Sequence, residues 1–456
     1  MKADRPALSP ARLLAWSVLG AVEGKGARIE VALNRCLAGE PLSGRDRALA
    51  TEIVYGVCRW QGFLDYILER CSDRPASKIE PEVQSLLRLG AYQILKLDKV
   101  PHRATVHTSV DLAKARLNPG AAGFVNAVLR RVCELAADPP LPEEANDPIG
   151  RLAVAQSHPR WLVERWCDEL GREECAALLE ANNTPGVLTL RTLLSAGGRQ
   201  RLSDRLARAG VEARPGRYSP QALAAAGANV ARLEEIAPAS AVAQSEAAQL
   251  ISLVLAPQPG WRVLDLCAGV GGKATHLAEL MGDEGQVIGL DKDPLRLEAG
   301  RRLARRLGMA SISFFRADAL GDWPQEAGSP LFEAVLVDAP CTGLGVLRSR
   351  PERRWRVKPT DPARLGRFQA RLLAAGAGHV RPGGVLIYAT CTLTVEENQG
   401  VAAGFLAANP DFEAQDATAY LPPSARSLVE PGGFLQTWPH RHGLDGFFAA
   451  RFKRRS

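Results

Sequence analysis

The stretch VLDLCAGVGGKATHLAEL, residues 263–280, predicts a strand, a glycine-rich turn and a helix in immediate succession. Val263–Leu266 is the short apolar run expected of a buried strand. Gly269, Gly271 and Gly272 allow the chain to turn tightly and to approach a ligand closely. This combination is typical of the first unit of a doubly wound α/β sheet that binds a ligand at the turn.

The same alternation continues towards the end of the chain. We expect strands at Val263–Leu266, Val287–Asp291, Ile312–Arg316, Ala334–Asp338, Val385–Thr390 and Phe447–Phe452. Helical segments lie between most of them, which indicates a Rossmann-like α/β domain with a mostly parallel sheet. This domain is expected to span residues 241–456, and residues 240–255 are expected to form a helix that leads into it.

Acidic residues follow the first three of these strands. Asp265 ends the first strand, and Asp291 ends the second, 22 residues after Gly269, where an acid suits a pair of ribose hydroxyls. Asp318 follows the third strand and can accept a hydrogen bond from an adenine amino group. With Lys273 at the start of the helix, the pattern favours S-adenosylmethionine. A nicotinamide dinucleotide and a turn without ligand are the alternatives, because GVGGKA also satisfies G-x-G-x-x-A.

Two cysteines stand where later strands give way to loops. Cys341 follows the fourth strand in VDAPCTG, and Cys391 follows the fifth in YATCT. Ligands of open α/β sheets bind at the carboxyl ends of the strands, so both thiols are expected beside the methyl donor. A thiolate that attacks carbon 6 of a pyrimidine prepares carbon 5 to take a methyl group. Asp338 and Lys273 on the same edge can supply hydrogen bonds and charge, and spacing alone does not say which cysteine attacks.

The remaining domains precede this one. Residues 1–137 read as a purely helical domain that starts at Ser9-Pro10. The proline-rich and acidic stretch DPPLPEEANDP opens a linker over residues 138–150. Residues 151–240 combine amphipathic helices with a short strand and are expected to form a small α/β module.

The number of cysteines and the net charge narrow the cellular compartment, the metal content and the binding partners that are expected. Nine cysteines with no CxxC pair indicate a reducing, cytoplasmic compartment without a disulfide framework, and they predict no structural zinc or other metal site. The net charge of +7 favours a polyanionic partner. No stretch is long enough to span a membrane, so no membrane partner is expected.

The basic charge is concentrated in residues 348–371, which hold nine Lys or Arg and two acids. A tryptophan among arginines suits stacking on an unpaired base, so we expect RNA contacts here. The expected RNA-binding residues are Arg348, Arg350, Arg353, Arg354, Trp355, Arg356 and Lys358. A second basic cluster, which is equally compatible with RNA contact and with a solvated helix face, consists of Arg296, Arg301, Arg302, Arg305 and Arg306.

The two cysteine motifs, DAPCTG and ATCTLTVEEN, resemble the paired signatures of RNA cytosine-5 methyltransferases of the NOL1/NOP2/Sun family. HGLDGFF, residues 442–448, is similar to the terminal motif of that family, and the likeness covers roughly 157–453. The resemblance implies that Cys391 is the nucleophile and that Cys341 assists product release. It also implies contacts with the methyl donor or the target base by Cys267, Ala268, Gly269, Val270, Gly271, Gly272, Lys273, Asp291, Asp318 and Asp338.

One departure from the family pattern lies in the glycine turn. The family usually has Pro before Gly-Gly-Lys and Thr after it, where this chain has Val270 and Ala274. Loss of the proline is expected to loosen the turn modestly and to lower the affinity for the methyl donor.

The helical first domain resembles NusB, an RNA-binding factor, in the stretches DRALATEIVYGVCRW and GFVNAVLRRV. A NusB-like domain joined to such a catalytic half is the arrangement of bacterial small-subunit rRNA cytosine-5 methyltransferases. The resemblance therefore implies action on 16S rRNA, either free or in a partly assembled small subunit. The sequence leaves the oligomeric state open, and a monomer is the favoured expectation. A non-catalytic RNA-binding or assembly protein with a relict cofactor pocket is the alternative.

Overall fold

The computed structural model describes residues 8–39, 42–226 and 230–456. The chain forms two compact units. Unit 1 comprises Met1–Asn183 and Ser349–Arg356, and unit 2 comprises Thr184–Arg348 and Val357–Ser456. The chain therefore leaves unit 2 at Ser349, contributes a short inserted segment, Ser349–Arg356, to unit 1, and then returns.

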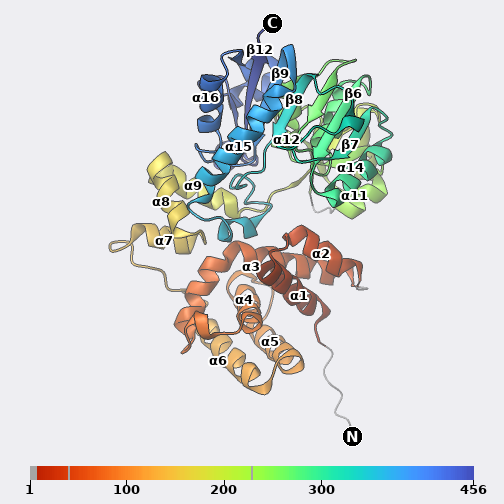
Figure 1. Ribbon diagram of the computed structural model, residues 1–456. Helices are drawn as coiled ribbons and strands as arrows, with labels where there is room; N and C mark the ends of the chain where they lie inside the picture. The colour runs from red at the N-terminus through yellow and green to blue at the C-terminus, as the bar shows by residue number, and fades with distance from the viewer. Residues whose placement is uncertain (1–7, 40–41, 227–229) are drawn as a thin grey trace. The chain divides into compact units, whose positions relative to one another are not determined.

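Unit 1 is built from helices in its described residues (Figure 1). Their bounds are α1 Pro10–Lys25, α2 Ile29–Ala38, α3 Gly44–Cys71, α4 Pro81–Lys96, α5 His102–Arg116, α6 Pro119–Leu135, α7 Pro148–Ala155, α8 Arg160–Leu170 and α9 Arg172–Asn183. The expected start at Ser9-Pro10 is confirmed, with Pro10 opening α1. Ser43 caps α3, because its hydroxyl accepts a hydrogen bond from the Asp46 backbone N–H at 3.1 Å. Apolar side chains at helical spacing on α1, α3, α4 and α6 form one continuous core.

The end of unit 1 falls within the chain region expected to form a small α/β module. Residues 138–147 contain neither helix nor strand, and α7 begins at Pro148. Of the expected module, residues 151–183 belong to unit 1 as helices, and the residues from Thr184 onward belong to unit 2.

Unit 2 begins with a small antiparallel sheet. Its strands, in the order β2-β3-β1-β4, are β1 Leu188–Thr192, β2 Ala213–Pro215, β3 Ala222–Ala225 and β4 Ala241–Ala243, accompanied by the helices α10 Gly198–Arg208 and α11 Val230–Ile236. The expected helix over residues 240–255 is wrong in its first part. Ala241–Ala243 pair with β1, and α12 begins only at Glu246, after Ser245 caps it. Pairing with a distant strand overrides the local preference for helix.

The large sheet of unit 2 confirms the mostly parallel Rossmann-like architecture. Its strands are β5 Arg262–Asp265, β6 Gln286–Asp291, β7 Ile312–Arg316, β8 Phe332–Asp338, β9 Val380–Thr390, β10 Phe412–Gln415, β11 Leu435–Gln436 and β12 Phe448–Arg454. They lie in the order β10-β12-β9-β8-β5-β6-β7, and β11 pairs with β12. The strands β5, β6, β7, β8 and β9 pair in parallel, whereas β12 is antiparallel to β9, β10 and β11. The sequence predicts every parallel strand of this sheet.

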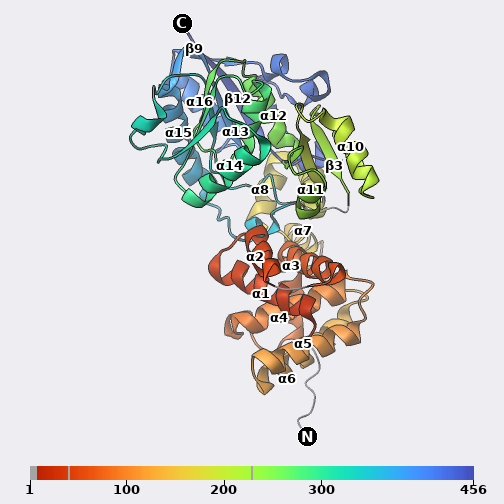
Figure 2. The same ribbon diagram turned by 90° about the vertical axis from the view of Figure 1, so that its right-hand side faces the viewer.

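Helices cover both faces of the large sheet (Figures 1 and 2). One core contains residues of α12 Glu246–Leu255, α13 Gly272–Leu280 and α14 Pro294–Leu307, and the other contains residues of α15 Asp361–Gly378 and α16 Gln399–Ala408. Val263 lies in the first core and its neighbour Leu264 in the second. A strand buried on both faces needs apolar residues at successive positions, which explains the unbroken apolar runs.

The strand order reverses between β5 and β8. After β5 the chain adds β6 and β7 on one side, and then places β8 and β9 on the other. Ligands of such sheets bind outside the carboxyl ends of the strands at this reversal. Asp265 ends β5 and Asp338 ends β8, so the reversal lies where the sequence predicts the site.

Candidate active site

The glycine turn between β5 and α13 folds onto the end of β6. Gly269 and Gly271 have φ values of +56° and +78°, which glycine adopts without steric cost. A Cβ on Gly271 would lie 2.9 Å from Cζ of Phe314, so packing also requires glycine there. The Gly269 N–H donates a hydrogen bond to Oδ2 of Asp291 at 3.0 Å. The expected cofactor residues that lie in this turn and at the start of α13 are Cys267, Ala268, Gly269, Val270, Gly271, Gly272 and Lys273.

The other positions of interest in and after this turn differ in exposure. Val270 is 53% exposed at the turn, whereas Ala274 is fully buried in α13. Asp318 is exposed and follows β7. Burial, reinforced by the charge of Asp265, raises the pKa of the Cys267 thiol, so this cysteine stays protonated. Its side chain packs against the hydrophobic core that contains residues of α15 and α16.

Lys273 and Asp338 form an ion pair at the reversal point. The Lys273 Nζ lies 2.6 Å from Oδ2 of Asp338, and the two side chains are 13% and 29% exposed. Burial alone would lower the pKa of Lys273, but the charge and hydrogen bond of Asp338 raise it overall, with smaller contributions from Asp265 and Cys391. The site therefore contains a fixed cation.

Asp265 is a fully buried carboxyl group beside this ion pair. Neither of its carboxylate oxygens has a hydrogen-bond partner of ordinary geometry. Burial, followed by the charge of Asp338, raises its pKa to about 7, and Lys273 opposes the shift. A buried acid with so few donors is costly unless a ligand supplies one, which makes Asp265 a candidate binding residue.

The two expected thiols lie together. Sγ of Cys341 is 3.2 Å from Sγ of Cys391, and the Cys391 backbone N–H is 3.4 Å from Sγ of Cys341. The two cysteines follow the adjacent parallel strands β8 and β9, in which Asp338 is in register with Ala389. The structure therefore brings all four expected catalytic residues, Cys341, Cys391, Asp338 and Lys273, to one edge of the sheet.

Two glycines that the sequence analysis did not single out hold the loops of the site together. The Gly345 N–H donates to the Cys391 carbonyl at 3.1 Å, and the Gly446 N–H donates to the Gly345 carbonyl at 2.7 Å. A Cβ on Gly345 would lie 2.0 Å from the Gly446 oxygen, so only glycine allows these backbones to approach. The signal was present in CTGLG and in HGLDGFF, but neither motif reveals its partner.

The basic segment does not present all its side chains to solvent. Arg354 is fully buried in unit 1, where its Nη1 donates to the Ser157 carbonyl at 3.0 Å and to Oδ1 of Asn183 at 2.8 Å. Burial lowers the pKa of its guanidinium. The expected RNA contact is wrong for Arg354, because a buried guanidinium that satisfies protein acceptors does not reach a phosphate.

The neighbours of Arg354 in the inserted segment also bind unit 1. Nε1 of Trp355 donates to the Cys58 carbonyl at 2.7 Å, and its ring lies against Gly62, where a Cβ would come within 2.5 Å of it. Arg356 donates to the carbonyls of Val22, Gly26 and Ala27 around the end of α1. Trp355 and Arg356 therefore serve as anchors of the inserted segment.

The remaining expected RNA contacts differ in their surroundings. Arg348 lies in unit 2 and donates to the carbonyls of Thr184 and Gly443. Arg350 and Arg353 are half-buried, and Lys358, which follows the inserted segment, is exposed. RNA binding by these four residues stays a prediction.

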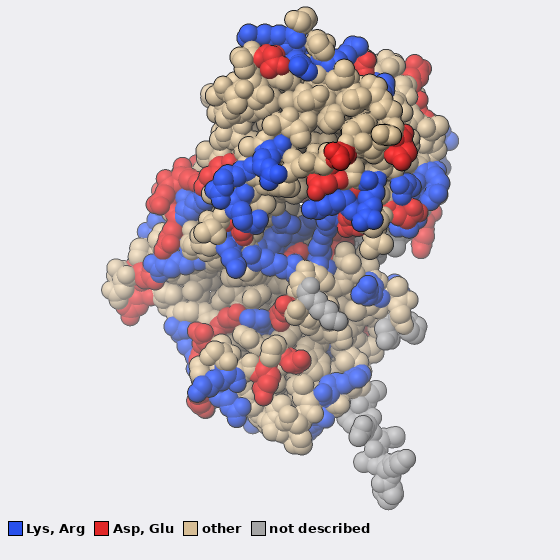
Figure 3. All heavy atoms as spheres, viewed as in Figure 1, with Lys and Arg blue, Asp and Glu red and all other residues tan. Residues whose placement is uncertain are grey.

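The second basic cluster lies on α14, and several of its arginines form ion pairs with an acidic residue of the same helix. Glu298 lies 3.8 Å from Arg301, 3.9 Å from Arg302 and 3.2 Å from Arg305. On the right-hand side of Figure 3, where Figure 1 labels α14, acidic side chains are interspersed with basic ones. Such mixed charge is typical of a solvated helix face, which is the interpretation that the contacts favour.

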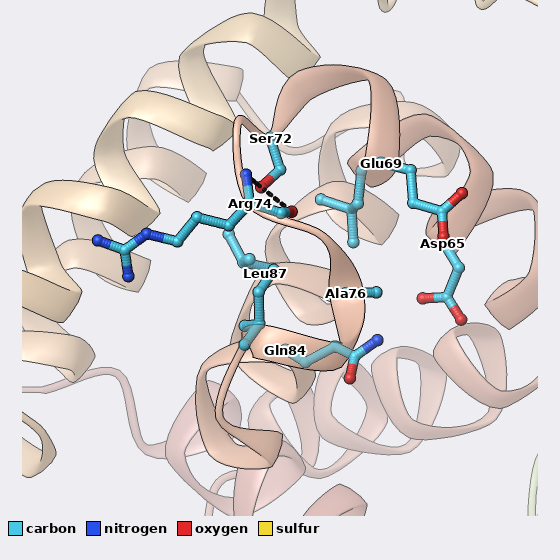
Figure 4. A pocket seen from close by; sticks show the side chains of 9 residues that line it. Asp65, Glu69, Ser72, Arg74, Ala76, Gln84 and Leu87 are labelled. Atoms are coloured by element: carbon cyan, nitrogen blue, oxygen red, sulfur yellow. Dashed lines mark hydrogen bonds between the residues drawn. The ribbon is translucent and has the colours of Figure 1, made fainter.

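A pocket within unit 1 offers no comparable chemistry (Figure 4). Its lining residues are Asp65, Leu68, Glu69, Ser72, Arg74, Ala76, Ile79, Gln84 and Leu87. Asp65 is already paired with Arg88, at 2.6 Å. Among the residues that the structure describes, no group of three His, Cys, Asp or Glu side chains could hold a metal ion. None of the described helices is both long enough and apolar enough to cross a membrane.

Comparison with known proteins places these features in a family. A model described as 16S rRNA methyltransferase RsmB/F matches residues 252–453, the NusB family model matches residues 9–134, and a ferredoxin-like domain model of RsmF/B-like methyltransferases matches residues 158–230. Ribosomal RNA small subunit methyltransferase B of Thermus thermophilus is 37% identical over 446 residues, which cover 97% of each chain. The chain belongs to the RsmB/F methyltransferase family.

Further relatives extend the match along the whole chain. The Bacillus subtilis protein named "Probable ribosomal RNA small subunit methyltransferase B" is 35% identical over 449 residues, which cover 97% of this chain and 98% of that protein. The crystal structure of PH0851 is 26% identical, covers 98% of this chain and 99% of its own, and superposes with a TM-score of 0.84. The resemblance drawn from the cysteine motifs and from the NusB-like helices is therefore confirmed at the level of family and fold.

Proposed function

We propose that this chain transfers a methyl group from S-adenosylmethionine to carbon 5 of a cytosine in 16S rRNA through a covalent adduct with Cys391. The observation that carries the proposal is the pair of thiols, Cys341 and Cys391, 3.2 Å apart on the edge that holds the Lys273 ion pair. Membership of the RsmB/F family supports small-subunit rRNA as the substrate.

The residues at the strand ends fit the methyl donor. The buried carboxylate of Asp265, whose oxygens accept no hydrogen bond of ordinary geometry, suits its ammonium group. Asp291 accepts backbone N–H groups from Gly269 and Asp293, one on each oxygen, and each oxygen keeps a lone pair for a ribose hydroxyl. Asp318, exposed after β7, suits the adenine amino group. When bound, S-adenosylmethionine supplies an electrophilic methyl group.

The chemistry of the protein then centres on the two thiols. The Cys391 thiolate adds to carbon 6 of a cytosine that lies outside the base stack, and this addition makes carbon 5 nucleophilic. Lys273 is the fixed cation that favours a thiolate at this edge. Once carbon 5 carries its methyl group, a general base takes the carbon 5 proton. The electron pair of that C–H bond re-forms the double bond between carbons 5 and 6, and the carbon–sulfur bond breaks to free the Cys391 thiolate. Cys341 lies close enough to assist this release.

Transfer of labelled methyl groups tests the proposal. The full chain is incubated with S-adenosylmethionine labelled in its methyl group and with 16S rRNA, either free or in small subunits, and the product is mapped to 5-methylcytosine by mass spectrometry. Cys391→Ala should reduce transfer to background. Cys341→Ala should accumulate a protein–RNA adduct that survives a denaturing gel, because Cys391 still attacks while release is impaired.

Cys36→Ala is the matched control, since Cys36 is a partly exposed thiol on α2 of unit 1 and belongs to neither cysteine motif. It should transfer methyl groups at the wild-type rate. Full activity of Cys391→Ala would contradict the covalent mechanism. Binding of rRNA without any calorimetric signal for S-adenosylmethionine would favour the alternative, an RNA-binding assembly protein. The proposal includes action as a cytoplasmic monomer.

A further inference from the structure

Glu397 is a fully buried acid that contacts both the loop after β8, which carries Cys341, and the loop after β9, which carries Cys391. It lies in the stretch TLTVEEN, between Cys391 at the end of β9 and the start of α16. No Lys or Arg among the described residues forms an ion pair with it. A charge of this kind is stable in a protein only if hydrogen bonds replace the lost water.

Four neutral donors supply those hydrogen bonds. Oε1 accepts from the Thr342 backbone N–H at 2.8 Å and from Nε2 of Gln369 at 2.9 Å. Oε2 accepts from the hydroxyl of Thr342 at 2.5 Å and from that of Thr394 at 2.8 Å. Each oxygen of the carboxylate is therefore doubly occupied, which is the full capacity of the group.

The donors come from different parts of the fold. Thr342 follows Cys341 in the loop after β8, Gln369 lies on α15, and Thr394 lies in the loop after β9. Gln369 also donates to the Pro340 carbonyl at 2.9 Å. The carboxylate thus joins the loop that carries Cys341 to the loop that carries Cys391.

The hydrogen-bond chain has a fixed direction, because a carboxylate only accepts. Thr342 donates its hydroxyl hydrogen to Glu397 and has no second hydrogen to give. In the 2.6 Å hydrogen bond between the hydroxyls of Thr342 and Thr392, Thr392 is therefore the donor. Thr342 and Thr392 are the residues directly after the two cysteines. Both cysteine positions are therefore tied to the same acid, one residue away from each thiol.

We propose that Glu397 is a positioning residue, whose buried carboxylate sets the spacing between the Cys341 and Cys391 thiols so that both reach one cytosine. The proposal deepens the proposed function and rests on it for its catalytic consequence. The spacing itself is a property of the folded protein and is measurable without RNA or methyl donor.

The first test measures the spacing by thiol cross-linking. Diamide takes two hydrogens and two electrons from a pair of thiols, which become a disulfide, and peptide mass spectrometry identifies the Cys341–Cys391 pair. Glu397→Ala should form this disulfide at least about tenfold more slowly than the wild type, because loop fluctuations separate the thiols. Glu397→Gln, which keeps the shape and part of the hydrogen bonding, should be slowed less.

Thr390→Val is the matched control. Thr390 is also fully buried and adjacent to Cys391, but its hydroxyl donates to Oδ1 of Asn398, at the end of the loop that follows β9, at 2.6 Å. This variant should cross-link at the wild-type rate even if it is less stable. Wild-type cross-linking by a folded Glu397→Gln and Glu397→Ala would overturn the proposal, and so would equal slowing by Thr390→Val. If Glu397→Ala fails to fold, the comparison of disulfide formation rates between Glu397→Gln and Thr390→Val is sufficient to decide the proposal.

The second test follows the protein–RNA adduct in a single turnover. Glu397→Gln should form the adduct but release it at least about fivefold more slowly, with KM for rRNA within about twofold of the wild type. Adduct formation and release both at wild-type rates would contradict the positioning role. Failure of the wild type to methylate RNA would instead defeat the proposed function, while the cross-linking rates would still decide the role of Glu397 in spacing.

Discussion

A single buried carboxyl group, that of Asp265, should make binding of the methyl donor depend on pH. Burial and the charge of Asp338 raise its pKa to about 7, whereas Asp in an unfolded chain has a pKa of about 3.9. The folded protein therefore holds this proton up to about pH 7. An ammonium group needs the carboxylate form, so the affinity should fall by up to about tenfold per pH unit from pH 7 down to pH 5.

Calorimetric titration with S-adenosylmethionine between pH 5 and pH 7 measures this dependence, in a range where the amino group of the ligand stays protonated. Asp265→Asn should bind weakly with little pH dependence. The same raised pKa makes the folded wild type lose stability relative to Asp265→Asn as pH rises from about 4 to 7, because the unfolded chain releases the proton first. A wild-type affinity that is flat across this range would contradict the assignment.

The residues of the site differ in how readily the sequence predicts them. Cys341, Cys391, Asp338 and Lys273 all lie at the end of a predicted strand or the start of a predicted helix, and the rule that parallel strand ends meet is enough to bring them together. Glu397 belongs to no such position. Its partners are set by the paths of two loops and by α15, which local sequence patterns do not encode.

At the scale of secondary structure elements, strand β1 of the small sheet is fastened to helix α13. Arg191 on β1 is fully buried, its Nη1 donates to the Gly272 carbonyl at 2.7 Å, and its Nε lies 3.2 Å from Oε2 of Glu279. Arg191→Met should lower the free energy of unfolding by about 3–5 kcal/mol, because the Glu279 carboxylate is left buried without its cation. Urea denaturation measures the change.

The double variant Arg191→Met with Glu279→Gln is the control for that prediction. Removing the orphaned charge should recover a substantial part of the lost stability, so the two substitutions should not be additive. Additive losses would show that Arg191 stabilises the protein through packing and its other hydrogen bonds rather than through Glu279. Because Gly272 opens α13 beside the glycine turn, weaker binding of S-adenosylmethionine should accompany the single substitution.

The elements that the sequence predicts share a local signal, and those that it misses lack one. The strands β5 to β9 are apolar runs bounded by polar turns, and their helices show regular periodicity. In contrast, β4 consists of Ala-Val-Ala, which has no strong preference for a strand and forms one by pairing with β1. The short strands β10 and β11 likewise depend on pairing with β12.

At the scale of the whole molecule, several side chains of the inserted segment form hydrogen bonds within the protein, although the sequence predicts that they bind RNA. Arg354, Trp355 and Arg356 lie between two stretches of unit 2 in the sequence, yet their hydrogen bonds go to helices and loops of unit 1. The sequence shows the cluster of arginines, but it does not show which carbonyl oxygens accept their hydrogen bonds. The segment is therefore anchored within unit 1.

This difference between anchor and RNA contact is measurable from the salt dependence of rRNA binding. Lys358 is exposed and follows the segment, so Lys358→Ala should reduce the slope of log K against log salt concentration by about 0.7–0.9, the value for one lost phosphate contact. Trp355→Ala should leave that slope unchanged. It should instead lower the free energy of unfolding by about 2–4 kcal/mol, through loss of ring packing and of the hydrogen bond to Cys58.

The two substitutions control for each other, since they lie three residues apart and only one removes a charge. Filter binding across a salt series gives the slopes, and chemical denaturation gives the stabilities. If Trp355→Ala weakened rRNA binding uniformly across salt while its stability matched the wild type, the ring would be stacking on RNA and the anchor would be wrong. If Lys358→Ala left the slope unchanged, Lys358 would not contact a phosphate. The same salt series on Arg348→Ala, Arg350→Ala and Arg353→Ala would then decide whether the rest of the basic stretch binds rRNA.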